Sequence, residues 1–208
     1  MDINIIHNES CLVGLRSLPD NCIDCCITSP PYFGLRDYGT AEQIGLEESP
    51  ELFVEKLVEV FLEVRRVLKP EGTLWLNLGD SYCSTAPNSM SAPLRQEGIL
   101  SGVSDKVSSA RKSLRPKTPT GMKPKDLMGI PWLTAFALRG SGWYLRQEII
   151  WAKAYTTLAE NFGTTMPESV TDRFVKSHEQ LFLLSKSSKY YFDIDSIKKP
   201  IKDSSSKR

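Results

Sequence analysis

Two consecutive prolines end an apolar segment near the start of the chain, and this junction narrows the choice of fold more than any other feature. The segment, residues 22–28, reads Cys-Ile-Asp-Cys-Cys-Ile-Thr. So few polar positions predict a strand that is buried on both faces, as in parallel sheets. Pro30 and Pro31 follow Ser29, and because proline has no backbone N–H, they stop strand pairing. We therefore expect a stiff loop at the carboxyl end of a buried strand.

The clearest helical pattern lies between residues 49 and 68. Ser49 is a favourable N-cap, and Pro50 stands at the first helical position, where its missing N–H costs nothing. Apolar residues recur at helical spacing and predict one buried stripe, made of Phe53, Leu57, Val60, Val64 and Val67. A turn is expected at residues 70–72, which read Pro-Glu-Gly.

Further elements follow the same logic. Helices are expected over residues 12–18 and 124–138, and strands over residues 3–7, 22–28, 73–78, 143–151 and 179–184, with 189–192 extending the last. Strands that alternate with helices predict a mostly parallel sheet with helices on both faces. The last two strands follow each other without a helix, so we expect an antiparallel pair. Trp143 and Trp151 fall on one face of their strand and are expected in the core.

This order predicts an α/β, Rossmann-like sheet with its chemistry at the carboxyl ends of the strands. A chain of 208 residues is long enough for one such core. We expect a single domain over residues 1–201, with a long mobile loop at about 83–123 and a disordered tail at 202–208. Asp80 stands at the end of a predicted strand, where it either lines the site or caps a turn.

Composition leaves nucleic-acid binding to local clusters, because the formal net charge is only +1. The N-terminus has no basic region followed by an apolar run, and no stretch approaches the roughly 20 apolar residues that span a bilayer. We expect a cytoplasmic protein without a membrane partner. The five cysteines are an odd number, which indicates reduced thiols. Cys22 and Cys25 have a metal-ligand spacing but stand in a predicted buried strand without a second pair, so no metal is expected.

Residues 28–32, Thr-Ser-Pro-Pro-Tyr, resemble the catalytic signature of the DNA amino-methyltransferases. Several further segments are similar to the same family, namely residues 15–27, 34–39, 64–73, 77–82, 142–151, 167–173 and 177–193. Pro-Pro-Tyr alone is also typical of a simple turn after a strand. Because the neighbouring segments agree, the family is the better interpretation, and it makes residues 1–201 the catalytic part of a methyltransferase domain.

The resemblance implies transfer of a methyl group from S-adenosylmethionine to an exocyclic base amine. Such an amine is a poor nucleophile, because its lone pair is delocalised into the ring. The Ser29 side-chain oxygen and the Pro30 carbonyl are expected to accept its two N–H groups, in a loop that Pro31 stiffens. Tyr32 is expected to stack on a base flipped out of the duplex. No Pro-Cys dipeptide occurs, so direct transfer without a covalent enzyme–base intermediate is expected.

The resemblance also implies contacts to cofactor and DNA. Family members have an Asp after their first strand, where this chain has Ser10 preceded by Glu9, so Glu9, Ser10 and Thr28 are expected to contact the cofactor. Double-stranded DNA is expected to meet basic side chains near the signature and in the loop, namely Arg36, Arg111, Lys112, Arg115, Lys117 and Lys123. The basic stretch of the loop is equally compatible with a disordered linker.

The chain departs from the family at the cofactor motif. The permuted class that it resembles carries a later Asp-Pro-Phe-x-Gly-x-Gly-Thr turn, and no segment here matches it. Two strands from that region stand, in the family, between the strands that match residues 3–7 and 22–28. Either the two local strands pair directly, a complementing C-terminal polypeptide supplies the others, or a truncated product folds poorly, and unpaired edges would favour self-association. We expect low activity from the isolated chain.

Three functions stay open from the sequence. The first is a DNA methyltransferase, with N4 of cytosine slightly favoured over N6 of adenine because Ser29 stands where many members have Asp. The second changes the substrate to a protein glutamine amide, and the basic loop and aromatic-rich flanks favour DNA over it. The third is a catalytically inactive fragment or complementing subunit that binds DNA without cofactor.

Overall fold

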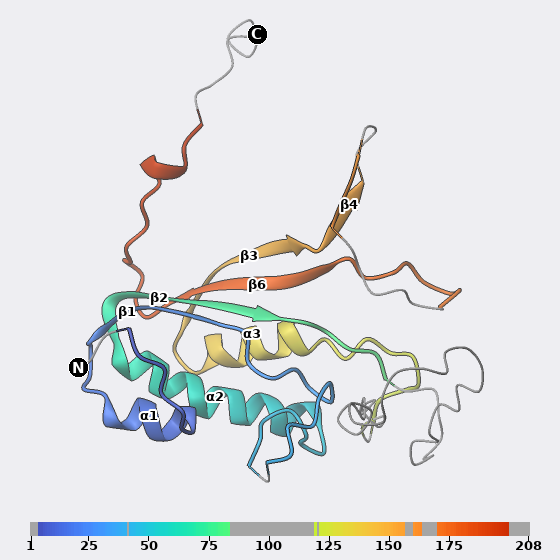
Figure 1. Cartoon of the computed structure of the whole chain (residues 1–208), viewed down its shortest axis with the longest axis horizontal. Coiled ribbons are helices and arrows are strands. Elements are labelled where there is room, and N and C mark those ends of the chain that lie inside the picture. Colours follow the sequence, from blue (N-terminus) through green and yellow to red (C-terminus); the bar gives the residue numbers. More distant parts are fainter. Residues whose placement is uncertain are drawn as a thin grey trace, which may run out of the picture.

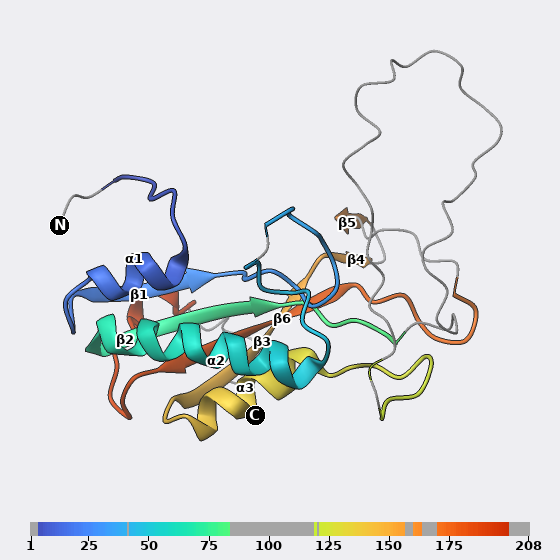
Figure 2. The ribbon, with the colours of Figure 1, turned by 90° about the horizontal axis from the view of Figure 1, so that it is seen from below.

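The computed structural model describes residues 4–40, 42–83, 119, 121–156, 160–163 and 170–199. Within these residues the elements are α1 (Cys11–Ser17), β1 (Ile23–Thr28), α2 (Pro50–Val67), β2 (Leu68–Leu78), α3 (Ile130–Gly140), β3 (Tyr144–Ala152), β4 (Ala154–Thr156), β5 (Asn161–Gly163), β6 (His178–Ser185) and η1 (Asp195–Ile197). Four strands form one sheet in the order β1-β2-β6-β3, and β4 pairs with β5. Figures 1 and 2 show α1, α2 and α3 on one face of the larger sheet. The predicted α/β class is confirmed, whereas the described helices cover one face and not two.

The hydrophobic core lies between the helices and this covered face. α2 begins as predicted, because Ser49 is its N-cap and the Ser49 side chain accepts a hydrogen bond from the Leu52 N–H. Phe53 on α2 is 0% exposed and packs beside Phe33, with ring centroids 5.5 Å apart. The strand side chains of this cluster are also 0% exposed, namely Leu68, Leu74, Leu76, Leu78, Phe182 and Leu184. Each such side chain contributes about 1.5–3 kcal/mol by leaving water.

The sheet is mixed, and the expected predominance of parallel pairs is not seen. β1 and β2 are parallel, but β2 pairs antiparallel with β6, and so does β3. The predicted antiparallel pair of the last two long strands is therefore confirmed as β3 and β6. The predicted extension at residues 189–192 is wrong, because the chain leaves the sheet and the Tyr191 N–H donates to the Glu71 carbonyl.

β2 starts five residues earlier than predicted. Ile23 pairs with Leu68, yet Cys25 pairs with Thr73, so the residues between Leu68 and Thr73 form a bulge against β1. Gly72 is enclosed there, because a Cβ atom would lie 3.0 Å from the Lys69 carbonyl oxygen. The predicted turn at residues 70–72 is wrong, because Pro70 and Gly72 lie in the bulged part of β2 and do not end the strand.

The strand predicted at residues 3–7 is also wrong over residues 4–7, which have no regular structure. Ile5 is 51% exposed and Ile6 is 97% exposed. The segment therefore does not close up against β1, which is the edge of the sheet and has β2 as its one partner among the described strands. Without a partner among the described strands, this segment lacks the ladder hydrogen bonds that would make it a strand.

Helix α3 begins later than predicted, at Ile130. Gly129 immediately before it has φ 72°, a left-handed conformation that favours glycine, and Pro131 stands in the first turn. No helix in the described part of the chain is long and apolar enough to cross a membrane.

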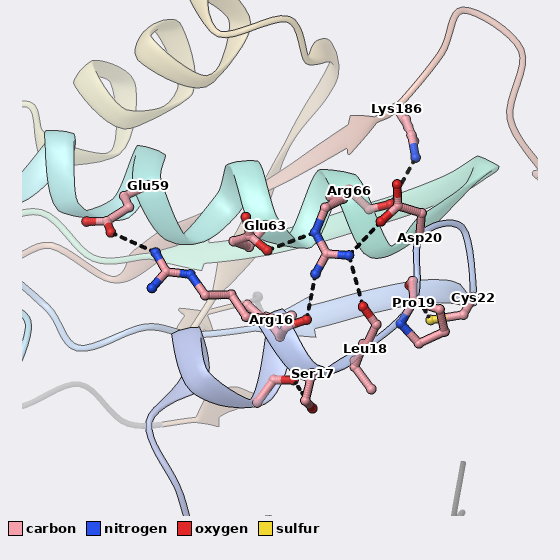
Figure 3. Close-up of polar contacts among 12 residues, drawn as sticks. Arg16, Ser17, Leu18, Pro19, Asp20, Cys22, Glu59, Glu63, Arg66 and Lys186 are labelled. Carbon is pink, nitrogen blue, oxygen red and sulfur yellow. Dashed lines mark hydrogen bonds and ion pairs between the residues drawn. The ribbon is translucent and has the colours of Figure 1, made fainter.

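A polar cluster fixes the amino-terminal end of β1 against α2 (Figure 3). The Arg66 guanidinium contacts the Asp20 carboxylate at 2.6 Å and the Glu63 carboxylate at 2.9 Å. It also donates to the carbonyls of Leu15 and Leu18, which end α1. Because one planar side chain binds groups from α1, its following turn and α2, the start of β1 has a fixed place on the helix layer.

Candidate functional site

A cavity of about 790 Å³ lies on the open face of the sheet, where β1 and β2 end and β6 begins. The predicted signature loop forms one wall, with Ser29, Pro30, Pro31 and Tyr32 all in the lining. The other walls come from loop residues, from the strands and from the segment after β3, and include Leu35, Arg36, Tyr38, Trp75, Asn77, Trp151, Lys153, Glu179 and Leu181. We call this the signature cavity.

Tyr32 is held by its hydroxyl inside the signature cavity. The hydroxyl oxygen lies 3.0 Å from Asn77 Oδ1 and 3.1 Å from Glu179 Oε2, so its one proton is shared between two acceptors. The Ser29 hydroxyl donates to the Tyr32 oxygen at 3.4 Å. Burial raises the pKa of Tyr32, the hydrogen bond from Ser29 opposes the rise, and the Glu179 carboxylate adds to it. Tyr32 is thus a neutral, hydrogen-bonded part of the wall.

Gly79 makes room for the Tyr32 ring. A Cβ atom at Gly79 would lie 2.6 Å from Tyr32 Cε2 and 2.9 Å from Cδ2. These separations are shorter than van der Waals contact, so any side chain at position 79 would displace the ring. The glycine that follows β2 is therefore a positioning residue for the signature tyrosine.

A lysine and a carboxylate form the polar end of the signature cavity. Lys153 Nζ lies 3.1 Å from Glu179 Oε2, and the same ammonium group lies 4.1 Å from the centre of the Trp151 ring. The Lys153 N–H donates to the Ser177 carbonyl at 2.7 Å, which fixes the backbone that carries the ammonium group. The cavity thus joins apolar walls to two cationic side chains, Arg36 and Lys153, and to the Glu179 carboxylate.

A second cavity, of about 520 Å³, lies on the helix side of the same loop. Glu9, Ser10 and Thr28, the three predicted cofactor contacts, all line it. Its floor is apolar and comes mainly from α2, with Leu57, Val60, Phe61 and Val64. We call this the helix-side cavity. Residues 28–31 line both cavities, so the signature loop is the wall between them.

Two cysteines, Cys11 and Cys26, line the helix-side cavity, and the Cys26 thiol is held in its protonated form. Burial, with a smaller effect of Cys25, raises the pKa of Cys26 to about 11. The helix-side cavity also contains the carboxylate of Glu9, and its Oε1 atom lies 3.5 Å from His7 Nδ1. Gly14 faces it, because a Cβ atom there would lie 3.1 Å from Glu9 Oε1.

The predicted DNA contacts separate into three groups. Arg36 lines the signature cavity. Lys123 is exposed, lies 4.0 Å from the Asp126 carboxylate and lines neither cavity. Arg111, Lys112, Arg115 and Lys117 lie outside the described residues, as does most of the predicted loop at 83–123 and the whole predicted tail at 202–208.

Asp80 caps a helix and does not line the signature cavity. Its carboxylate accepts hydrogen bonds from the Ile130 N–H at 3.1 Å and from the Ser81 N–H at 2.9 Å. Burial raises the pKa of this carboxyl, although Lys176 and the backbone donors oppose the rise. Asp80 thereby joins the end of β2 to the start of α3, which settles the alternative left open by the sequence.

Sequence reasoning missed the far wall of the signature cavity. Trp143 is buried as predicted, but Trp151 is 49% exposed and lines the cavity, so its predicted core position is wrong. A bulge between Leu145 and Gln147 shifts the alternation of β3 by one residue and turns the two tryptophans to opposite faces. Asn77 and Glu179 were not predicted either. The available signal was a polar residue in an otherwise apolar strand, since Asn77 lies inside β2 and Glu179 near the start of β6.

A family described as DNA methylase matches residues 23–208. The Type II methyltransferase M.XycI of Xanthomonas campestris pv. cyanopsidis is 49% identical over 190 residues, which cover 91% of this chain and 56% of that protein. The chain spans about half the length of the curated relatives that it matches at this level.

Two solved structures share the fold. The cytosine-N4-specific PvuII DNA methyltransferase has a TM-score of 0.54 and 14% identity, covering 88% of this chain and 49% of that one. A putative DNA modification methylase from Thermus thermophilus, solved with S-adenosyl-L-methionine, has a TM-score of 0.51 and 19% identity, covering 89% and 54%. With the family match over residues 23–208, the signature loop between two cavities places this chain in the DNA methylase family.

Proposed function

We propose that the chain is the catalytic part of a site-specific DNA methyltransferase, which moves a methyl group from S-adenosylmethionine to an exocyclic base amine. The observation that carries the proposal is that residues 28–31 form the common wall of the two cavities. An amine held at this wall from one side would face a donor held on the other. Methyl transfer requires that approach, because the donor and the acceptor must meet in line.

The proposed role of the loop is to aim the amine. The Ser29 oxygen and the Pro30 carbonyl would accept its two N–H groups and free the nitrogen lone pair. Ser29 is suited to this role, because its hydroxyl donates its proton to the Tyr32 oxygen. The lone pairs of the Ser29 oxygen are then available to accept an N–H group of the amine. Pro30 and Pro31 are half-buried and have no N–H, so their carbonyl positions are stiff. The Tyr32 ring would supply the aromatic surface against the base.

The helix-side cavity fits a methyl donor in size and lining. Its volume of about 520 Å³ is in the usual range for cofactor sites. Glu9 and Ser10 would bind polar groups at its rim, Thr28 would contact the reacting end, and the α2 side chains would pack against the apolar surface. S-adenosylmethionine, when bound, supplies the activated methyl group on a sulfonium centre.

The proposed substrate is double-stranded DNA, and we favour N4 of cytosine over N6 of adenine because Ser29 opens the signature. Arg36 at the signature cavity would contact the target strand, and the basic residues at 111–123 would contact phosphates. The free edge of β1 supports one further proposal, that a complementing polypeptide or a second copy pairs there to complete the sheet. It also favours the second candidate function, a complementing subunit that binds DNA without cofactor.

The test combines calorimetry with S-adenosylmethionine and transfer of a radiolabelled methyl group to duplex DNA of mixed sequence. Cofactor binding at micromolar strength and transfer that Ser29→Ala abolishes would support the proposal. Transfer that survives Ser29→Ala would contradict the role of the loop. DNA binding without cofactor binding up to millimolar concentration would favour the second candidate. Glu59→Gln, on the outer surface of α2, is the control for folding.

A further inference from the structure

A row of polar atoms leads away from Ser29 across the signature cavity. Ser29 Oγ lies 3.4 Å from Tyr32 Oη, which lies 3.1 Å from Glu179 Oε2, which in turn lies 3.1 Å from Lys153 Nζ. The residues come from the signature loop, the segment after β3 and the start of β6. Each neighbour in the row is a hydrogen-bond or ion-pair partner of the next, so the row is continuous from the amine-binding serine to an ionisable carboxylate.

Glu179, and not Asn77, is the end of this row that can take a proton. Both side chains accept from the Tyr32 hydroxyl, at 3.1 Å and 3.0 Å. The Asn77 amide donates to the Gln180 carbonyl at 3.2 Å, which keeps its oxygen toward Tyr32. An amide oxygen does not hold a proton near neutral pH, whereas a carboxylate does so readily. Asn77 therefore orients Tyr32, and Glu179 is its one proton-accepting partner among the described residues.

We infer that Glu179 receives, through Tyr32, the proton that the amine must lose after methylation, and this inference rests on the proposed function. When the new N–C bond forms, the donor leaves as a neutral thioether, and the methylated nitrogen carries a positive charge until it loses a proton. That proton passes to Ser29 Oγ, the Ser29 hydroxyl proton passes to Tyr32 Oη, and the Tyr32 proton passes to Glu179 Oε2. One N–H and two O–H bonds break while three O–H bonds form, and the charges on nitrogen and carboxylate cancel.

The surroundings of Glu179 allow its carboxylate to hold a proton for a short time and then release it. The Glu179 side chain is 23% exposed and the Lys153 side chain 36%, so the carboxylate is sheltered but can return the proton to water. Lys153 balances the carboxylate charge in the resting state and is itself held over the Trp151 ring. The Ser29 contact of 3.4 Å is long for a hydrogen bond between oxygens, and such contacts tighten when a substrate fills the site.

The first readout is the rate of methyl transfer by the full chain as a function of pH. Glu179→Gln and Tyr32→Phe should each lower kcat by about ten- to a hundredfold with little change in KM for DNA. The residual rate should rise with pH, because hydroxide and water then take the proton. Glu179→Asp should recover part of the rate. Glu59→Gln removes a carboxylate that is also paired with a lysine, on the outer surface of α2, and should leave the profile unchanged.

The second readout needs no turnover. The ionisation of Tyr32 is followed by near-ultraviolet absorbance, as the difference between the native chain and Tyr32→Phe. Because the Glu179 charge disfavours tyrosinate, Glu179→Gln should move the midpoint to lower pH, and Glu59→Gln should not move it.

The two readouts distinguish failure of this inference from failure of the proposed function. Turnover in the native chain with an unchanged kcat and pH profile in Glu179→Gln would overturn the proton path and leave the methyltransferase intact. Absence of turnover in the native chain would count against the proposed function. In that case a Tyr32 midpoint that does not respond to Glu179→Gln would also overturn the path, because the two groups would not be coupled.

Discussion

The two faces of the four-stranded sheet are built from alternate residues of the same strands, yet they have opposite environments. On the helix-covered face, Leu76 and Phe182 are 0% exposed. On the other face, Trp151 is 49% exposed and Ile27 is 78% exposed. The polar groups of the signature cavity lie on this open side. Because neighbouring strand residues point to opposite faces, a single strand can supply both core and site.

The difference between the faces separates stability from chemistry. On the covered face a side chain is surrounded by others, so removing it leaves a cavity in a dense core. On the open face a side chain has space on one side, so removing it changes the shape and polarity of the site more than the free energy of folding. Substitutions on the covered face should therefore lower the free energy of unfolding, whereas substitutions on the open face should lower activity.

The largest effect should come from Phe53→Ala in the helix layer. Phe53 is 0% exposed and contacts Phe33, so truncation removes buried apolar surface and leaves a void. We expect a loss of about 3–5 kcal/mol in the free energy of unfolding, measured by urea denaturation. Trp151→Ala, which truncates a larger but half-exposed ring on the open face, is the matched control and should cost less than about 1 kcal/mol. Equal losses would erase the distinction between the faces.

The next effect should appear in activity and not in stability. Gly79→Ala places a methyl group 2.6 Å from Tyr32 Cε2, so the ring must move away from the cavity wall. We expect methyl transfer to fall about a hundredfold, which corresponds to roughly 2.7 kcal/mol in transition-state stabilisation. The urea midpoint should change little, because the ring can move into the open cavity. Gly140→Ala, where a Cβ atom meets nothing within 4 Å and the backbone does not have a positive φ, controls for the loss of a glycine. Full activity of Gly79→Ala would contradict the positioning role.

The successes of sequence-based prediction concern local signals. α2 was predicted because Ser49, Pro50 and the apolar stripe lie within one continuous segment, and each acts through neighbours a few residues away. The signature loop was predicted for the same reason, since Pro30 and Pro31 restrict the backbone whatever packs around them. Helices and loops whose determinants are contiguous can be found without knowing the fold.

The failures concern partners that are distant in sequence. Trp151 was assigned to the core because strict alternation was assumed, and the bulge after Leu145 exists only through pairing with β6. Glu179 enters the site because β6 lies beside β2, an order that no local pattern contains. Residues 4–7 have strand-forming composition but no strand beside them among the described residues. In each case the outcome depends on the order of the sheet.

A smaller effect on stability should depend on pH and concerns Asp80, which joins the end of β2 to the start of α3. Its pKa is raised by burial above the ordinary value of 3.8, so the folded state binds this proton more tightly than the unfolded state. Protonated Asp80 therefore adds its full contribution to the free energy of unfolding below pH 3.8, the ordinary pKa. This contribution is lost as the pH rises through the higher pKa of the folded state. Asp80→Asn keeps an oxygen for the Ile130 N–H but cannot ionise. Urea unfolding at several pH values from about 4 upward should give a shallower fall in stability for the variant. Parallel curves would mean that Asp80 is not the group responsible.

The smallest effect should come from Ile27→Ala at the free edge of the sheet. Ile27 pairs in register with Trp75 but is 78% exposed, so little apolar surface returns to water when it is truncated. We expect the free energy of unfolding to change by less than about 0.5 kcal/mol, whereas Leu76→Ala, one residue further along β2 on the covered face, should cost about 2–5 kcal/mol. A loss of similar size at both positions would show that Ile27 is covered in solution. A dependence of this loss on protein concentration would identify a second copy of the chain as the cover.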